Sequence, residues 1–291
     1  MPCAHWRKYQ MYFITLIFIA CITISSPYAI AQQDDAEQII GQSFENKRVD
    51  DQISKLTFLF DGPNKDKQEV IYTMVWKNMH GEDGFDSKAM FFTESPPEKK
   101  GIAYLGWLRP DGSAKNDDEW VYLPELRSTR RLAHRDHEHN HDDDEFGNSI
   151  LTTDHLEPRL PELDDHEFIG EKSLEGKSYY LIRSTPKIHI NHGSAHQGNT
   201  TFRAIIRWIE KDTYLIQRKQ FLNENDAIDI DMQIAWVEVQ GFWLWHRISA
   251  INPKNNNTTI MTVSETQINL GLKNKDFSKR MLKKGVARLR K

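Results

Sequence analysis

Cysteine is nearly absent from this chain, which excludes disulfide bonds as a means of stabilising the fold. Among 291 residues only Cys3 and Cys21 are cysteine, and both precede Ala31, after which we expect an N-terminal segment to be cleaved. The exported protein would then have no thiol, although its destination would be oxidising. Its stability therefore has to come from a packed core.

Long apolar runs are also lacking, apart from a short one near the N-terminus. Arg7 and Lys8 precede an uncharged run over residues 11–24, and residues 29–31 (Ala-Ile-Ala) have the small-x-small form that a signal peptidase needs. The run is shorter than the roughly 20 residues of a membrane-spanning helix. Residues 1–31 are therefore predicted to be a secretory signal peptide, with lipid attachment at Cys21 as the minor alternative.

An excess of positive charge is missing as well. Cleavage after Ala31 removes two of the 38 basic residues and no acidic one, so 36 remain against 42 acids and the formal charge becomes −6. This balance argues against nucleic acid as a partner.

Motifs of nucleophilic and nucleotide chemistry are lacking too. The chain contains no G-x-S-x-G, no G-x-G-x-x-G and no phosphate-cradling glycine loop. We therefore expect a binding protein, and not an enzyme.

A long series of strand-like segments is what the chain has instead. The acids and apolar spacing of residues 34–52 predict an amphipathic helix, with Ala36, Ile39, Ile40 and Phe44 on one face. Beyond it, segments rich in β-branched and aromatic residues, separated by turn residues, predict about ten strands in an antiparallel meander within a single domain over residues 32–291. These segments are 69–80, 87–95, 101–109, 119–125, 177–184, 200–210, 212–222, 229–239, 241–251 and 258–270.

Several of these segments are apolar on both faces. In residues 69–80, Tyr72, Met74 and Trp76 alternate with Ile71 and Val75. Either helices and a partner cover the two faces, or a curved sheet holds an apolar ligand in its cavity. The side chains that we expect to line such a cavity are Tyr72, Met74, Trp76, Phe92, Tyr104, Trp107, Trp120, Tyr122, Trp208, Trp236, Trp243 and Trp245.

Histidines and acids are concentrated in a predicted loop at residues 133–145. Residues 137–141 have the H-E-x-x-H form of zinc proteases, but acids flank them where a catalytic helix needs apolar residues. Weaker capture of Zn²⁺ or Cu²⁺ and a merely solvated loop both remain open. The candidate ligands are His134, His137, His139 and His141, and a second group, His189, His192 and His196, could join them only if the fold brings the loops together.

The C-terminal residues 278–291 form a basic tail. Phe277, Met281, Leu282, Val286 and Leu289 have near-helical spacing, and seven basic residues lie between positions 279 and 291. The segment is predicted to dock as a helix and to continue either as a solvated terminus or as a contact to an anionic membrane surface.

Three motif-like segments lie within residues 91–156. They are a P-x-x-x-x-G-like segment from Pro97 to Gly101, a W-x-Y-L-P strand over residues 120–124 with basic residues at its end, and an F-x-G-S-D-F-T-Y-x-D-like segment from Phe146 to Asp154. In this combination they resemble the LolA-like outer-membrane lipoprotein-sorting proteins of bacterial periplasms. The chain departs from the pattern at residues 146–149, which read Phe-Gly-Asn-Ser, and in the lengthened loop before them.

The resemblance implies a mainly β fold with some α, a strongly curved antiparallel half-open barrel closed by helices. It also implies a periplasmic, non-enzymatic carrier for acyl chains of a lipid or lipoprotein, without catalytic residues or cofactor, and a partnership with the outer membrane or with an exporter of the resistance-nodulation-division (RND) type. The basic residues Arg127, Arg130 and Arg131 after the W-x-Y-L-P strand could hold a headgroup or an acidic partner, or could pair with acids at the rim. A metal-binding or metal-responsive protein, and a structural accessory subunit of an envelope complex, are the alternatives.

Overall fold

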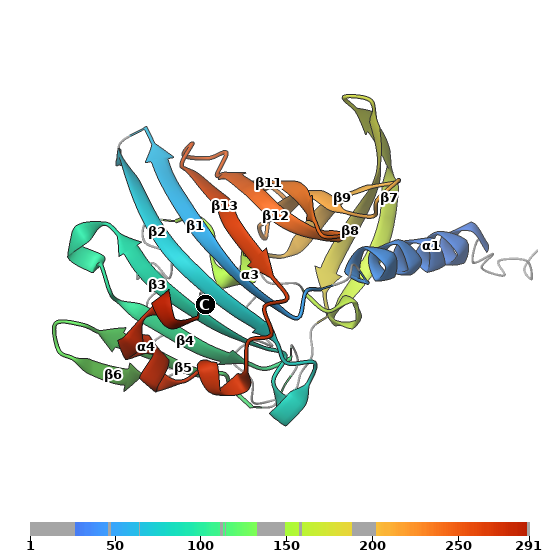
Figure 1. Cartoon of the computed structure of the whole chain (residues 1–291). Helices are drawn as coiled ribbons and strands as arrows, with labels where there is room; N and C mark the ends of the chain where they lie inside the picture. Colours follow the sequence, from blue (N-terminus) through green and yellow to red (C-terminus); the bar gives the residue numbers. More distant parts are fainter. Residues whose placement is uncertain are drawn as a thin grey trace, which may run out of the picture.

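Thirteen strands form one antiparallel sheet that twists and curves, with short helices on its faces (Figure 1). The computed structural model describes residues 27–45, 48–63, 65–110, 113, 115–132, 149–156, 159–187 and 202–289. The strands are β1 (Asp51–Gly62), β2 (Lys65–Asn78), β3 (Ser87–Ser95), β4 (Ala103–Leu108), β5 (Asp118–Leu123), β6 (Ser128–Arg131), β7 (Asp164–Leu174), β8 (Lys177–Pro186), β9 (Ala204–Glu210), β10 (Ile216–Leu222), β11 (Ile228–Val239), β12 (Phe242–Ile251) and β13 (Thr258–Ile268).

The sheet consists of two meanders joined through β1 and β13. Its order is β6-β5-β4-β3-β2-β1-β13-β12-β11-β10-β9-β8-β7, and Phe58 of β1 faces Val70 on one side and Met261 on the other. The consecutive strands β6 and β7 therefore lie at opposite edges, so the chain between them has to cross the sheet. Within this crossing lies the single turn α3 (Thr153–Leu156), which Figure 1 shows behind β1 and β13.

The expected mainly β fold with one curved, unclosed antiparallel sheet is confirmed. The ten predicted segments correspond to β2 to β5 and β8 to β13. The helix predicted over residues 34–52 is wrong at its C-terminal end, because α1 (Pro27–Phe44) stops at Phe44 and β1 begins at Asp51. The sequence also missed β6, which has only four residues, and β7, a charged edge strand without a clear apolar period.

The two faces of the sheet bury separate cores. We call the face on which α3 lies the α3 face. Its largest cluster comprises Leu56, Phe58, Phe60, Val70, Leu151, Phe202, Ile205, Phe221, Ile230, Met232, Ile234, Ile248, Ala250, Met261 and Val263. The opposite face of β1 to β5 is called the C-terminal face, and its cluster comprises Ile53, Val75, Met90, Phe92, Ala103, Leu105, Trp120, Leu272, Phe277 and Leu282.

The last residues of the chain cover the C-terminal face. The 3-10 turns η4 (Asn274–Asp276) and η5 (Val286–Arg288) flank α4 (Lys279–Lys284), which lies in front of β4 and β5 in Figure 1. Phe277 is fully buried and Leu282 is 2% exposed. The buried Asp51 carboxylate accepts hydrogen bonds from the backbone N–H groups of Leu270 at 2.6 Å and Leu272 at 2.8 Å. This segment, residues 269–289, is therefore fixed both by a core contact and by a satisfied buried charge.

α1 covers the β7 end of the sheet. Ala36, Ile39 and Ile40 pack against Ile182 and Ile209, as the predicted apolar face of the helix requires. The predicted cleavage after Ala31 falls within the first turns of α1, and cleavage itself stays a prediction. In the described part of the chain, no helix combines the length and the apolar character needed to cross a membrane.

Three further 3-10 turns complete the described elements. They are η1 (Glu82–Gly84), η2 (Pro97–Lys99) and η3 (Pro161–Leu163). The last of these leads directly into β7 and places a cluster of polar side chains beside the α3 face.

Candidate functional site

The α3 face has an apolar floor that runs across seven strands. Register partners Leu56, Val263 and Tyr72 share one cross-strand row, while Phe58, Met261 and Ile248 share the next. The floor continues through Ile234 and Met232 on β11 to Phe221 on β10 and Ile205 on β9. Such a surface has to be covered, either by the protein itself or by an apolar ligand.

A short stretch that we call the cover segment, residues 149–156, lies on this floor. Leu151 is 1% exposed, and Ile150 and Leu156 pack beside it. The backbone N–H of Ile150 donates to Thr259 Oγ1 at 3.0 Å, which ties the segment to β13. The only helix in the segment is the four-residue α3, and a helix of this length has little stability of its own.

His155 caps the start of this turn. The backbone N–H of Thr152 donates to His155 Nδ1 at 3.0 Å, so Nδ1 carries no proton. The ring stands edge-on to Phe221, with 4.5 Å between ring centroids. Burial, followed by the charge of Lys219, lowers the pKa of His155 to about 4. The imidazole is therefore neutral at neutral pH, and its protonation would break the cap.

Two cations interrupt the apolar floor. One cross-strand row runs through Thr259, Ala250, Met232, Lys219, Arg207, Ile182 and Phe168. Arg207 of β9 and Lys219 of β10 are direct register partners in this row, and they are only 6% and 9% exposed. Like charges that face each other across two strands repel, and burial adds a desolvation cost for each of them.

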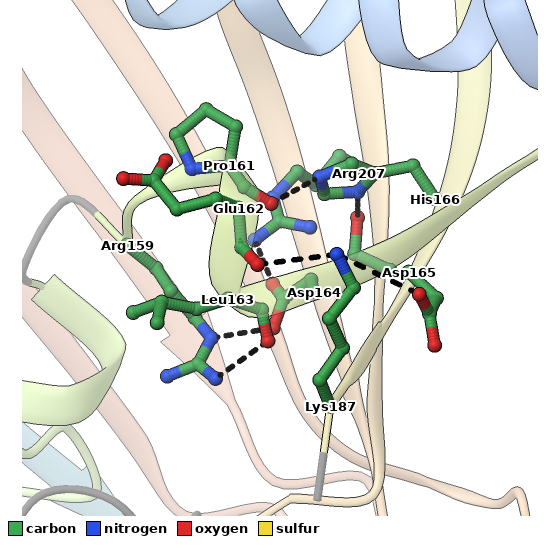
Figure 2. Close-up of polar contacts among 10 residues, drawn as sticks. Arg159, Pro161, Glu162, Leu163, Asp164, Asp165, His166, Lys187 and Arg207 are labelled. Carbon is green, nitrogen blue, oxygen red and sulfur yellow. Dashed lines mark hydrogen bonds and ion pairs between the residues drawn. The ribbon is translucent and has the colours of Figure 1, made fainter. Parts of the chain in front are cut away.

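A single carboxylate is shared between the arginines near this row (Figure 2). Asp164 Oδ1 accepts from Arg159 Nε at 2.6 Å, and Asp164 Oδ2 accepts from Arg207 Nη2 at 3.4 Å. His166 beside them accepts at Nδ1 from Ser184 Oγ at 2.8 Å and donates from Nε2 to the Pro161 carbonyl at 2.9 Å. Burial and then the charge of Arg207 lower the pKa of His166, so it adds no positive charge at neutral pH.

The cations are incompletely paired among the described residues. Arg207 Nη1 is buried there without a hydrogen-bond partner. Lys219 Nζ donates to the His155 carbonyl at 3.4 Å, and within the described ranges no carboxylate lies at ion-pair distance from it. Burial, followed by the charge of Arg207, lowers the pKa of Lys219 to about 7. The row thus places excess positive charge in an apolar surface.

The predicted cavity side chains divide among several places. Four of them border the apolar floor of the α3 face: Tyr72, Met74, Trp236 and Trp245. Another four belong to the C-terminal face: Phe92, Trp107, Trp120 and Tyr122. Trp76 packs in a small cluster with Val49, Leu244 and Ile268. Tyr104 contacts the ring of Phe91, Trp208 lies beneath Arg218 and beside Tyr179, and Trp243 is 38% exposed.

The predicted headgroup arginines lie away from the α3 floor. Arg127, Arg130 and Arg131 are all exposed, in β6 and in the turn before it, and Arg131 forms an ion pair with Asp118. The predicted metal ligands His134, His137, His139 and His141 lie outside the described residues, as do His189, His192 and His196. The described ranges contain no group of three potential ligands that could hold a metal ion, and the zinc or copper expectation stays a prediction.

The sequence reasoning missed the buried cation pair, although a signal for it was present. In residues 204–210 and 216–222, alternation places Arg207 with Ile205 and Ile209, and Lys219 with Phe221. A charged residue at an inward position of an otherwise apolar strand is the pattern that points to such a pair.

Solved structures with the same architecture define the class of protein. A DUF1329 family protein from Desulfovibrio piger has a TM-score of 0.72 and 20% identity, over 86% of this chain and 99% of that chain. A putative outer membrane lipoprotein-sorting protein domain from Vibrio parahaemolyticus has a TM-score of 0.68 and 17% identity, over 86% of this chain and 99% of that chain. A LolA superfamily protein from Nitrosomonas europaea has a TM-score of 0.59 and 14% identity, over 84% of this chain and 98% of that chain. The LolA-like fold predicted from the sequence is therefore confirmed.

The sequence also matches a protein family. The profile of a family described as "Uncharacterized protein" matches residues 85–284, and the chain belongs to that family. Among curated proteins, none matches this chain in sequence.

Proposed function

We propose that this protein is a periplasmic, non-enzymatic carrier that shelters the acyl chains of a lipid or lipoprotein on its α3 face. The observation that carries the proposal is the apolar floor across β1, β2 and β9 to β13, on which the cover segment packs through Leu151, Ile150 and Leu156. A lipoprotein-sorting protein domain among the fold neighbours supports the same reading.

The energies favour exchange of the cover segment for a ligand. The fully buried Leu151 contributes about 1.5–3 kcal/mol and the partly buried Ile150 and Leu156 contribute less, whereas an acyl chain gains about 0.8 kcal/mol per buried methylene. A chain of about 14 methylenes would gain roughly 11 kcal/mol. An acyl chain can therefore displace the cover segment and occupy its place on the floor.

The test begins with the protein purified from the periplasm of an expressing cell. Native mass spectrometry should detect co-purified lipid, and a fluorescent fatty acid should bind to the delipidated protein. A protein that contains no lipid and binds no fatty acid would contradict the proposal.

Cross-linking identifies the face that binds. A photoreactive fatty acid, mapped by mass spectrometry, should label residues around Phe221, Met232 and Leu151. Labelling confined to the surroundings of Phe277 and Leu282 would place the ligand on the wrong face. Delivery to the outer membrane and a partnership with an RND-type exporter stay predictions, to be tested by co-purification from membranes.

A further inference from the structure

We infer that Arg207 and Lys219 form a buried receptor for an oxyanion, and that the ligand of the α3 face is an anionic amphiphile whose carboxylate or phosphate lies against this pair. The inference rests on the proposed function and deepens it, because it specifies the headgroup chemistry of the cargo. The charges of the pair, its position in the floor and its unmet hydrogen-bonding capacity support it.

The charges near the row do not balance. Arg159, Arg207 and Lys219 supply three cations, and Asp164 is the one carboxylate that binds any of them within the described residues. Asp164 already divides its two oxygens between Arg159 and Arg207. Two other acids are near these groups. The charge of Asp229 acts to raise the pKa of His155, but Asp229 is itself paired with Lys254 at 2.8 Å. The charge of Glu37 on α1 acts to raise the pKa of His166. One additional negative charge would offset much of the remaining repulsion.

The position of the pair within the floor selects an amphiphile. Along the row, Met232 and Ala250 lie on one side of the cations, and Ile182 and Phe168 lie on the other. Phe221 and Ile205 form a neighbouring cross-strand row on the same two strands, β10 and β9. Because α1 already packs on Ile182 and Phe168, the hydrocarbon chain of an oxyanion at the pair would extend over Met232 and Ala250 on the other side.

The donors also match an oxyanion. Among the described residues, Arg207 Nη1 has an unused N–H donor, and the hydrogen bond of Lys219 Nζ is to the carbonyl of His155 in the cover segment. Displacement of the cover segment by a ligand would release Lys219 for a second contact. A guanidinium and an ammonium on adjacent strands can then bind the two oxygens of one carboxylate or phosphate.

The experiment compares a fluorescent fatty acid, cis-parinaric acid, with its methyl ester. The wild-type protein should bind the acid about tenfold or more tightly than the ester. Lys219→Met should remove this preference, which is measured as the ratio of the acid and ester affinities within each protein, because the same change also releases the contact to the cover segment. The matched control is Lys88→Met, which removes a 5% exposed lysine from the other face and should keep the preference.

The outcomes separate this inference from the proposed function. Equal binding of acid and ester by the wild-type protein, or a preference that persists in Lys219→Met, would overturn the oxyanion receptor but keep the carrier. Failure to bind either compound would overturn both. Inorganic phosphate alone should raise the melting temperature less than the fatty acid does; an equal rise would assign the pair to free phosphate and overturn the amphiphile. The acid and ester comparison on the wild-type protein decides the question even if Lys219→Met does not fold.

Discussion

The α3 face and the C-terminal face are both closed by short segments, but different interactions hold the two segments. The C-terminal segment is fixed by the Asp51 carboxylate, which binds two backbone N–H groups, and by Trp107 Nε1, which donates to the Phe277 carbonyl at 3.1 Å. The cover segment is tied to the sheet by Thr259 Oγ1 and by the long contact from Lys219. The first segment therefore has more polar anchors than the second, which is the segment that the proposed function expects a ligand to displace.

The buried lysines of the two faces show the same difference. Burial lowers the pKa of Lys88 too, but the charges of Asp83 and Glu82 oppose this shift, and Lys88 Nζ lies 4.7 Å from the centroid of the Trp107 ring and 5.3 Å from that of Phe85. Lys219 faces Arg207 in the sheet register and lacks such a favourable environment. A buried charge that the fold compensates contributes to structure, whereas one that the fold leaves uncompensated is a candidate for ligand recognition.

A matched pair of leucine truncations should give the largest measurable difference between the two faces. Leu151→Ala and Leu282→Ala each remove a fully buried side chain, and each should lower the free energy of unfolding by about 2–5 kcal/mol. Only Leu151→Ala should also strengthen fatty-acid binding, by about tenfold, because it lowers the cost of displacing the cover segment. Urea unfolding and probe titration measure the two effects. Stronger binding in Leu282→Ala would mean that the two segments do not differ as described.

Acid should destabilise the α3 face through His155. The folded protein holds the pKa of this group at about 4, below the 6.5 of the unfolded chain. The unfolded chain therefore binds an additional proton between these values, and the free energy of unfolding should fall by up to about 3 kcal/mol as the pH falls through this window.

Urea unfolding across this window checks the prediction. His155→Gln should show a shallower loss than the wild-type protein, with the remainder belonging to other groups such as His166. An identical slope in the variant would show that His155 does not titrate in this way.

Alkaline conditions should stabilise the protein through Lys219. Its pKa of about 7 in the fold lies below the 10.5 of the unfolded chain. The unfolded chain binds the additional proton between these values, so the free energy of unfolding should rise with pH, by about 2 kcal/mol from pH 7 to pH 9. Lys219→Met should remove this rise and be more stable than the wild-type protein at pH 7. The rise should persist in Lys88→Met, and its loss there would contradict the assignment to Lys219.

The smallest effects are expected at the exposed arginines. Arg131 is 67% exposed and pairs with Asp118, and such surface pairs contribute about 0–1 kcal/mol. Replacing Arg127, Arg130 or Arg131 with Ala should therefore change stability little and leave fatty-acid binding unchanged. Binding that weakens in one of these variants would instead support the headgroup role expected from the sequence.

Much of the fold could be predicted because its signal is local. Alternation of apolar side chains identified β2 to β5 and β8 to β13, and the sequence motifs around Trp120 led to the LolA-like family. β1 was missed because no strand was assigned between the predicted helix, which ended at residue 52, and the turn at residue 62, although Leu56, Phe58 and Phe60 alternate there. β7 was missed because an exposed edge strand need not alternate.

The candidate site was less predictable because it depends on contacts between distant residues. The aromatic side chains were selected by type, and the fold distributes them over both faces. Leu151 lies in the family-like segment 146–154 and His155 directly follows it, but nothing in that motif showed that the two side chains are buried against the sheet. Arg207 and Lys219 are 12 residues apart, and only the register of β9 with β10 places them opposite each other.

Residue spacing and composition along the chain were enough to predict the antiparallel strands, the absence of a thiol from residues 32–291 and the LolA-like fold. Tertiary structure alone decided which side chains share a face, which segment covers each face, and where buried charge is left uncompensated. These features depend on the joining of β1 to β13 and on the crossing between β6 and β7, and no local pattern records the pairing of residues 200 positions apart.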